Sequence, residues 1–269
     1  LTPLEKNPPK LTKPKSIAAG IPGVLASFSH SVSNNLSSSI YNLSKVNRFQ
    51  GFDCPGCAWP DPDDHRSRFE FCENGAKAVA DERTKNKADP NFWSNWSVKE
   101  LSLKSDNWLN KQGRITDPMV LMPNSMHYTK ISWDEAFDII ATELASLKDV
   151  NKSIFYTSGR TSNEAAFLWQ LLARWFGTNN LPDCSNMCHE SSGVALTESI
   201  GIGKGTVKLD DFNKADLIIV IGQNPGTNHP RMLSALSDAK KSGASVISIN
   251  PLKETGMIRF KHPQKPLDL

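Results

Sequence analysis

The sequence has 269 residues, 38% hydrophobic and 22% charged, a composition typical of a globular protein of about two domains. No apolar run approaches the roughly 20 residues that cross a bilayer, so we expect no membrane span. The 31 Lys and Arg residues against 28 Asp and Glu residues give a formal charge of +3. This weak and scattered excess does not indicate a nucleic-acid partner.

Five cysteines fall into two groups, which are Cys54, Cys57 and Cys72, and then Cys184 and Cys188. An odd number in a chain of this length does not match the dense disulfide framework of a small secreted protein, and no export signal is visible. We therefore expect a cytoplasmic, reducing compartment in which the thiols bind metal or take part in chemistry.

Two stretches in the first quarter of the chain lack regular periodicity. Residues 1–48 are rich in Ser, Pro, Lys and Asn, which predicts a flexible lead-in with one short helix around residues 17–30. Residues 51–62 carry Gly or Pro at almost every second position, which predicts a loop without regular backbone hydrogen bonding. Such a loop needs another support, and a bound metal centre would provide one.

Helix and strand patterns alternate from Ser132 onward. Ser132 and Glu135 form a capping box that opens an amphipathic helix. Two continuous apolar strands flank a later helix, a βαβ pattern typical of a parallel sheet covered on both faces. The sequence therefore predicts an α/β fold. We expect helices over residues 133–147, 163–176, 191–200 and 230–242, and strands over residues 153–157, 217–221 and 245–249.

The first group of chemical residues lies in the Gly- and Pro-rich loop and just beyond it. Cys54 and Cys57 form a Cys-x-x-Cys turn, Asp61 follows four residues later, and Cys72 is further along. Thiolates at the two ends of such a turn can reach one metal centre. An iron–sulfur cluster, a redox dithiol and an incomplete zinc site all remain open. The prolines after Cys57 disfavour the helix that a thioredoxin-like motif requires.

A second group lies between a polar turn and an expected helix start. The dipole at the helix N-terminus would favour a thiolate at Cys188, either as a nucleophile or as a metal ligand. His189, next to it, is of the residue type that moves protons near neutral pH. A capping or packing role remains open for His189, and a buried packing role is our interpretation of Cys184.

Three loops leave the carboxyl ends of expected strands, where ligands bind in open α/β sheets. Residues 222–230 join a strand to a helix, and backbone amides at such a position suit phosphate. Asn250 and Pro251 follow the next strand at the same edge of the sheet, so we expect them to contact the same ligand. Gly159 and Arg160 leave their strand in the same way. The loop lacks the Gly-x-Gly-x-x-Gly pattern, so a site of the NAD type is not supported.

Taken in order, these motifs resemble the molybdopterin oxidoreductase superfamily, in its branch of formate-dehydrogenase-like alpha subunits. The resemblance covers residues 51–263, and the ordered set is far more specific than any single motif. It rests on residues 156–164, 177–180, 184–189, 222–225 and 249–251.

The resemblance implies a small iron–sulfur-binding N-terminal region followed by parts of two Rossmann-like parallel-sheet domains, incomplete at the C-terminus. The chain would then be the N-terminal portion of a longer enzyme and inactive alone. The corresponding boundaries are a lead-in over residues 1–48, an iron–sulfur-binding region and linker over 49–129, a first α/β domain over 130–183 and a pterin-dinucleotide-binding domain over 184–269.

The resemblance also implies cofactors and residue roles. Cys188 matches the molybdenum ligand, and His189 matches the histidine that handles the substrate proton. Two electrons would pass to molybdenum and then singly through a 4Fe-4S cluster to an electron-transfer partner protein, with a small molecule as substrate. Cys54, Cys57 and Cys72 match three cluster ligands. The residues that match loops holding a bis-molybdopterin guanine dinucleotide are Gly159, Arg160, Gly222, Asn224, Pro225, Asn250 and Pro251.

Three departures from the family pattern bear on the mechanism. Asp61 stands where the usual third cysteine would be, which leaves open an Asp-ligated cluster, a three-iron cluster or no cluster. Asn74 replaces a common lysine, and Glu190-Ser191 replaces the Gly-Pro that commonly follows the histidine in formate dehydrogenases. Formate is therefore one substrate among several, and tungsten could replace molybdenum. A thiol–disulfide oxidoreductase or a zinc-binding module using Cys54 and Cys57 is the alternative.

Overall fold

The structure is a computed structural model that describes residues 13, 15–32, 36–57, 59–63, 66–157, 161–182 and 189–265. Its backbone contacts divide the chain into two compact units that interleave along the sequence. The first unit comprises residues 1–87, 102–114 and 207–269, and the second comprises residues 88–101 and 115–206. Each unit is described by itself.

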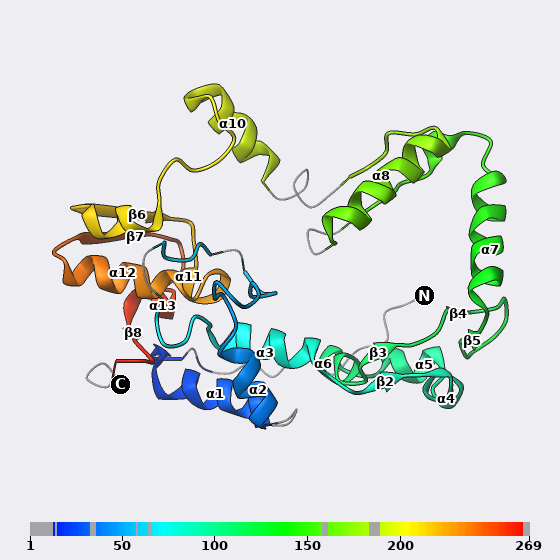
Figure 1. Ribbon diagram of the computed structural model, residues 1–269, viewed down its shortest axis with the longest axis horizontal. Coiled ribbons are helices and arrows are strands. Elements are labelled where there is room, and N and C mark those ends of the chain that lie inside the picture. The colour runs from blue at the N-terminus through cyan, green and yellow to red at the C-terminus, as the bar shows by residue number, and fades with distance from the viewer. Residues whose placement is uncertain are drawn as a thin grey trace. The chain divides into compact units, whose positions relative to one another are not determined.

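Three helices form one side of the first unit (Figure 1). Helix α1 (Gly20–Val32) packs against both α2 (Leu36–Leu43) and α3 (Glu73–Glu82). Leu43 and Val46 are buried with two residues of α3, and Cys54 packs against the same cluster. The helix expected around residues 17–30 is confirmed as α1. The described part of the expected lead-in also contains α2, and Leu43 and Val46 anchor this stretch against α3, while most of its other apolar side chains are exposed.

The predicted βαβ unit is confirmed in the first unit. Strands β6 (Leu217–Ile221) and β7 (Ser245–Ile249) pair in parallel, and α12 (Met232–Lys241) connects them. Two short helices, α11 (Pro225–Asn228) and α13 (Thr255–Ile258), follow the strands. The unit also contains the 3₁₀ helix η2 (Leu209–Lys214), helix α6 (Asp106–Asn110), and the parallel pair β1 (Ala18–Ala19) and β8 (Phe260–Lys261).

The β6–β7 pair is covered on one face only within the described residues. Val220 is buried against Met232 and Leu236 of α12, and Figure 1 shows α12 on one side of the pair. The opposite face is apolar but exposed, with Ile219 and Ile247 among its residues. No helix among the described residues covers this second face, so cover on both faces stays a prediction.

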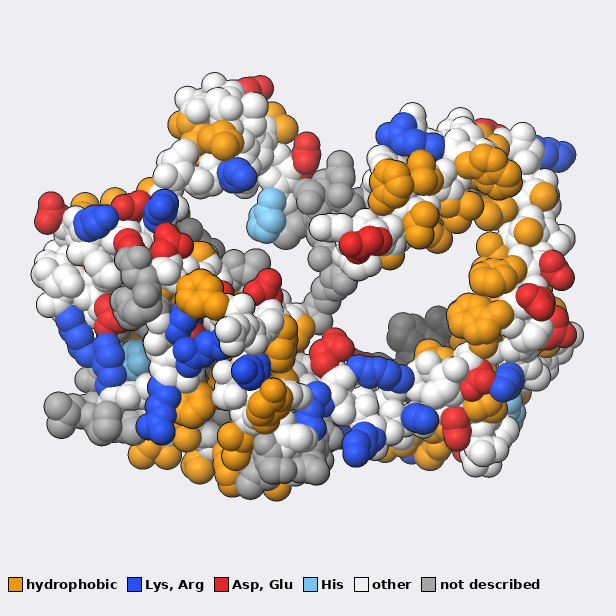
Figure 2. All heavy atoms as spheres, viewed as in Figure 1, with side chains coloured by type: hydrophobic (Ala, Val, Ile, Leu, Met, Phe, Trp, Pro, Cys, Tyr) orange, Lys and Arg blue, Asp and Glu red, His pale blue; other side chains and the backbone are white. Residues whose placement is uncertain are grey.

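The second unit is mainly helical. Helix α7 (Trp133–Ala145) begins at the predicted capping box, in which Ser132 and Glu135 bond reciprocally. Helix α8 (Asn163–Phe176) is capped by Ser162, and α10 (Glu190–Ile200) follows. Figure 2 shows apolar side chains exposed along α7 and α8. The remaining elements are α4 (Pro90–Asn95), α5 (Val98–Ser102), the 3₁₀ helix η1 (Val150–Lys152), the antiparallel pair β4 (Met119–Val120) and β5 (Thr129–Lys130), and strands β2 (Lys87–Ala88) and β3 (Arg114–Ile115) at the boundaries between the units.

The structure assigns no strand over residues 153–157, although Thr157 forms a single β-bridge. Residues 153–156 have an irregular backbone, in which the amide of Phe155 donates to the carbonyl oxygen of Asn180 at 2.9 Å. The Phe155 ring packs against Trp169 and Phe176 of α8. Burial explains the apolar pattern here, whereas a strand also requires a neighbouring strand to pair with. No helix in the described ranges is long and apolar enough to cross a membrane.

Candidate cofactor and metal site

The loop after β6 begins with a backbone turn that favours glycine. Gly222 has a φ of +63°, and its amide donates to the carbonyl oxygen of Ile249 at 2.8 Å. Asn224 then caps α11, since its Oδ1 accepts from the Thr227 amide at 3.2 Å. The Nδ2 of Asn224 donates to Glu254 at 2.8 Å. The side chain of Asn224 therefore holds the loop together locally, and Pro225 is buried behind it.

The loop after β7 lies beside the loop after β6. The Nδ2 of Asn250 donates to the carbonyl oxygen of Gln223 at 3.4 Å, and its Oδ1 accepts from the Leu252 amide at 2.9 Å. Pro251 follows on the exposed side of this loop. The expectation that the two loops share one edge of the sheet is confirmed. The ligand that they would hold remains a prediction.

Three cysteines gather around the start of α3. Cys72 caps this helix, with its Sγ accepting from the Gly75 amide at 3.4 Å. A Cβ atom placed on Gly75 would lie 3.0 Å from the Sγ of Cys54 and 4.0 Å from the Sγ of Cys72, so these two thiols flank the same glycine. Burial raises the pKa of the Cys72 thiol, and nearby Cys54 and Cys57 act in the same direction. Two amide hydrogen bonds, from Gly75 and Asn74, oppose the shift.

The three cysteines are free thiols. Cys54, Cys57 and Cys72 form no disulfide. Within the described residues, no three His, Cys, Asp or Glu side chains come close enough to one point to hold one metal ion. The ligands of a polynuclear cluster bind different irons and need not meet at one point, and thiolates are the ligands that such clusters take.

Asp61 lies among arginines. Its carboxylate oxygens are 2.8 Å from Arg66 Nη1 and 2.8 Å from Arg231 Nη2. Arg231 also contacts Glu70 at 2.7 Å. Sequence reasoning singled out neither arginine nor Glu70, because a lone Arg or Glu in an irregular segment usually lies in solvent.

The cysteine region contacts the loop after β6 at two places. The Nδ2 of Asn74 lies 3.5 Å from the carbonyl oxygen of Thr227. The ring of Trp59 packs 6.0 Å from that of His229, between ring centroids. The Nδ1 atom of His229 is buried, with no hydrogen-bond partner in the described structure. Sequence reasoning did not single out Trp59 or His229, and the position of Trp59 two residues after the Cys-x-x-Cys turn was the available signal.

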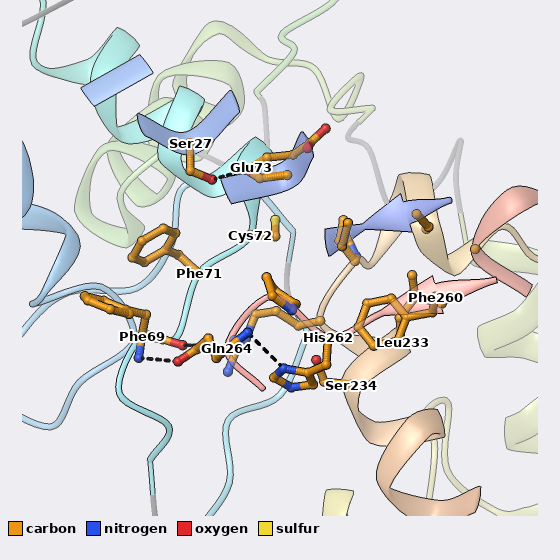
Figure 3. Close-up of a pocket in the computed structure, with 18 of the residues that line it drawn as sticks. Ser27, Phe69, Phe71, Cys72, Glu73, Leu233, Ser234, Phe260, His262 and Gln264 are labelled. Carbon is orange, nitrogen blue, oxygen red and sulfur yellow. Dashed lines mark hydrogen bonds between the residues drawn. The ribbon is translucent and has the colours of Figure 1, made fainter. Parts of the chain in front are cut away.

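A cavity of about 990 Å³ lies within the first unit and connects these features. Its wall includes Cys72 from the cysteine region and Asn224 and Thr227 from the loop after β6. Its volume is at the upper end of the range for small-molecule and cofactor sites. The residues labelled in Figure 3 line a further part of it, namely Ser27, Phe69, Phe71, Glu73, Leu233, Ser234, Phe260, His262 and Gln264.

Comparison with known proteins assigns the chain to a family. A family model described as molybdopterin oxidoreductase matches residues 114–267, more than half of the chain. The chain belongs to the molybdopterin oxidoreductase family. It is 57% identical over 252 residues to an uncharacterized oxidoreductase of Mycobacterium tuberculosis, and 50% identical over 254 residues to protein YdeP of Escherichia coli. These matches cover 93% and 94% of this chain but only 32% and 33% of the relatives, so the chain spans about a third of their length.

A more distant molybdopterin oxidoreductase relative is a putative formate dehydrogenase of Staphylococcus aureus. It is 30% identical over 169 residues, which cover 60% of this chain and 17% of that relative. Both the resemblance and the comparisons therefore lead to the same family.

Three expected site residues of this chain lie outside the described residues, namely Gly159, Arg160 and Cys188, as does Cys184, for which we expected a packing role. His189 is described. It occupies the N-cap position of α10, with an exposed side chain, in the second unit. The helix expected from residue 191 begins one residue earlier, at Glu190.

Proposed function

We propose that this chain forms the cluster-binding and part of the dinucleotide-binding region of a molybdenum-dependent oxidoreductase that resembles formate dehydrogenase. The observation that carries the proposal is the contact between the cysteine region and the loop after β6, at Asn74 and Thr227. Two candidate redox sites that exchange electrons must lie close together, and a shared cavity adjoins both.

The two loops at the edge of the sheet fit a dinucleotide. Gly222 has no neighbouring atom within 4 Å of where its Cβ would be, so the space beside its backbone is open to a ligand. Asn224, Pro225, Asn250 and Pro251 would form the rest of this cradle. Gly159 and Arg160 would contribute to the second pterin of the bis-molybdopterin guanine dinucleotide, with the guanidinium pairing with phosphate.

Cys188 and His189 would complete the reaction site. When bound, the molybdenum centre supplies two-electron oxidation or reduction of a small substrate. The Cys188 thiolate would hold the metal, and the His189 imidazole would accept or return the substrate proton. The start of α10 directly after His189 would orient the His189 side chain.

Cys54, Cys57 and Cys72 would hold the iron–sulfur cluster, which would exchange electrons with a partner protein. Half-burial limits solvent access to all three thiols. The contact of Asn74 with the loop after β6 would keep the cluster close to the dinucleotide. A cytoplasmic location is proposed with this function, because the thiols must stay reduced until the cluster is inserted.

Metal analysis of anaerobically purified protein, with a visible spectrum of the same sample, tests the proposal. Molybdenum or tungsten together with about four irons per chain is the expected result for a bis-pterin enzyme with one 4Fe-4S cluster. Zinc alone, without visible absorption, would contradict it and favour a zinc-binding module. A titratable dithiol without molybdenum would favour the thiol–disulfide alternative.

Two cysteine variants separate the two proposed centres. In the full-length protein, Cys57→Ser should lower the iron content, whereas Cys188→Ala should abolish turnover and leave the pterin content nearly unchanged. Retained turnover in Cys188→Ala would remove this residue as the metal ligand.

A further inference from the structure

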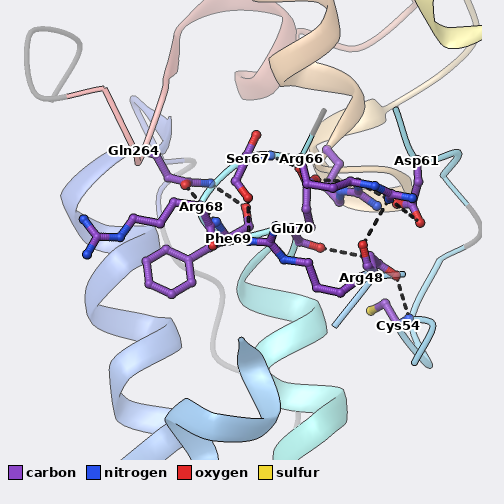
Figure 4. A network of polar contacts seen from close by, with 11 residues as sticks. Arg48, Cys54, Asp61, Arg66, Ser67, Arg68, Phe69, Glu70 and Gln264 are labelled. Carbon is purple, nitrogen blue, oxygen red and sulfur yellow. Dashed lines mark hydrogen bonds and ion pairs between the residues drawn. The ribbon is translucent and has the colours of Figure 1, made fainter. Parts of the chain in front are cut away.

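Four charged side chains form a chain of ion pairs next to the cysteine site, which we call the arginine–carboxylate network. Asp61 forms ion pairs with Arg66 and Arg231 through its two carboxylate oxygens, each at 2.8 Å, and Arg231 contacts Glu70 at 2.7 Å. The Oδ1 atom that faces Arg231 is buried and accepts no hydrogen bond within the described residues, so the ion pair is its polar contact there. Side-chain exposure ranges only from 6% for Glu70 to 24% for Asp61. Figure 4 labels three members of the network, Asp61, Arg66 and Glu70.

The charges of the network balance. Two guanidinium groups carry two positive charges, and the two carboxylates carry two negative charges. If Asp61 bound a metal ion through either oxygen, one arginine would lose a 2.8 Å partner. Arg66 and Arg231 are only 13% and 14% exposed, so water would compensate poorly for that loss. Removal of one partner from a buried ion pair is strongly destabilising.

Arg66 has few other polar groups that could take the place of Asp61 as its partner. Its Nη1 also donates to the carbonyl oxygen of Asn47 at 3.0 Å, and its guanidinium lies 4.7 Å over the Phe49 ring. Its Nε atom is already buried without a hydrogen-bond partner in the described part of the chain. If Asp61 were lost, the Nη1 atom of Arg66 would lose its ion pair, and a second nitrogen of this guanidinium would be poorly compensated for its burial.

The irregular segment before Cys72 depends on side chains for its polar contacts. The side chain of Gln264 forms two hydrogen bonds with the backbone of Phe69. It donates to the carbonyl oxygen at 2.7 Å and accepts from the amide at 3.2 Å. Arg48 donates to the carbonyl oxygens of Ser67 and Arg68, and Asn47 donates to that of Glu70 at 2.7 Å. Figure 4 shows these contacts gathered around the segment.

We infer that Asp61 is a positioning residue that holds Arg66 and Arg231, and that it is not a ligand of the metal centre. Arg231 lies directly before α12, at the end of the loop after β6. Through Asp61 and Glu70, the arginine–carboxylate network fixes the cysteine region against this loop. The inference about the metal centre rests on the proposed function, whereas the network itself does not.

Asp61→Asn and Asp61→Glu test the ligand role in the purified protein. Asn removes the charge, and Glu moves the carboxylate by one methylene group. We expect both variants to keep the iron content and the electron paramagnetic resonance spectrum of the reduced cluster, and Asp61→Asn to unfold at a lower temperature. Loss of iron in Asp61→Asn, or a shifted spectrum in Asp61→Glu, would overturn the inference. Asp63→Asn is the matched control, because Asp63 lies in the same loop and is 67% exposed.

A double-mutant cycle with Arg231→Gln tests the positioning role. If Asp61 acts through Arg231, the double variant should lower the unfolding midpoint by clearly less than the sum of the two single shifts. Additive shifts would overturn the role. If Asp61→Asn fails to fold, Asp61→Glu replaces it in the cycle.

The two proposals can fail separately. Wild-type protein without iron would contradict the proposed cluster, and the cycle would still test the network. Iron that persists in every variant, together with additive shifts, would instead contradict the network and leave the proposed function intact.

Discussion

Gly226 and Gly256 lie back to back, because a Cβ atom on Gly256 would be only 3.0 Å from the Cα of Gly226. This contact brings α11, which follows β6, against α13, which follows β7. Both helices border the candidate dinucleotide site, so the absence of two side chains determines how closely its two loops approach.

Gly256→Ala should therefore destabilise the first unit. The added methyl would meet the Gly226 backbone and also Leu233 Cδ1 at 3.2 Å, and overpacking of this kind costs about 1–3 kcal/mol. Thermal unfolding measures the effect. Gly205→Ala is the control, because no heavy atom lies within 4 Å of its added Cβ. Equal midpoints for the two variants would contradict the close approach.

The two faces of the β6–β7 pair should respond differently to truncation. Leu236 is 5% exposed beneath the pair, and Leu236→Ala should lower the free energy of unfolding by about 2–5 kcal/mol. Ile219 is 51% exposed on the other face, and Ile219→Ala should change it by no more than about 0.5 kcal/mol. Urea denaturation compares the two. An equal loss in both variants would show that another segment covers Ile219.

The capping box of α7 should make the stability of the second unit depend on pH. The amide of Ser132, and then its hydroxyl, hold the pKa of Glu135 below its ordinary value of 4.5. The folded pKa is therefore lower than the unfolded one, so the stabilisation is complete above pH 4.5 and is lost as the pH falls through the folded pKa.

Helicity followed by circular dichroism between neutral and acidic pH checks this dependence. Ser132→Ala should cost about 1 kcal/mol at neutral pH, the usual penalty for loss of an N-cap. Glu135→Gln keeps an acceptor but cannot titrate, so its part of the acid transition should disappear. An unchanged acid transition in Glu135→Gln would assign it to other carboxylates.

Local patterns in the sequence predicted several elements correctly, because each depends on neighbouring residues. The Ser132–Glu135 capping box opens α7, Ser162 opens α8, and the apolar runs form β6 and β7 in a βαβ unit. Parallel pairing also placed Gly222 and Asn250 at one edge, where their loops meet. The order of these motifs along the chain was then sufficient to predict the family.

Residue composition gave wrong secondary-structure predictions where the burial of apolar side chains determined the structure. The polar lead-in predicted an irregular segment, but Leu43 and Val46 give α2 and the turn after it a buried contact with α3. The apolar segment around Phe155 predicted a strand, but its ring packs on α8 without a strand partner in the described residues. Tertiary contacts outweigh local propensity in both cases.

The sequence by itself determined the chemistry that is available, namely three thiols near one loop, a βαβ unit with its ligand-binding edge, and the order of motifs that identifies the family. Only the tertiary structure decided which groups meet. Asp61 and Arg231 are separated by 169 intervening residues (231 − 61 − 1), yet they lie 2.8 Å apart. Periodicity and spacing describe neighbours along the chain, whereas an ion pair between distant residues forms only when folding excludes water from both charges.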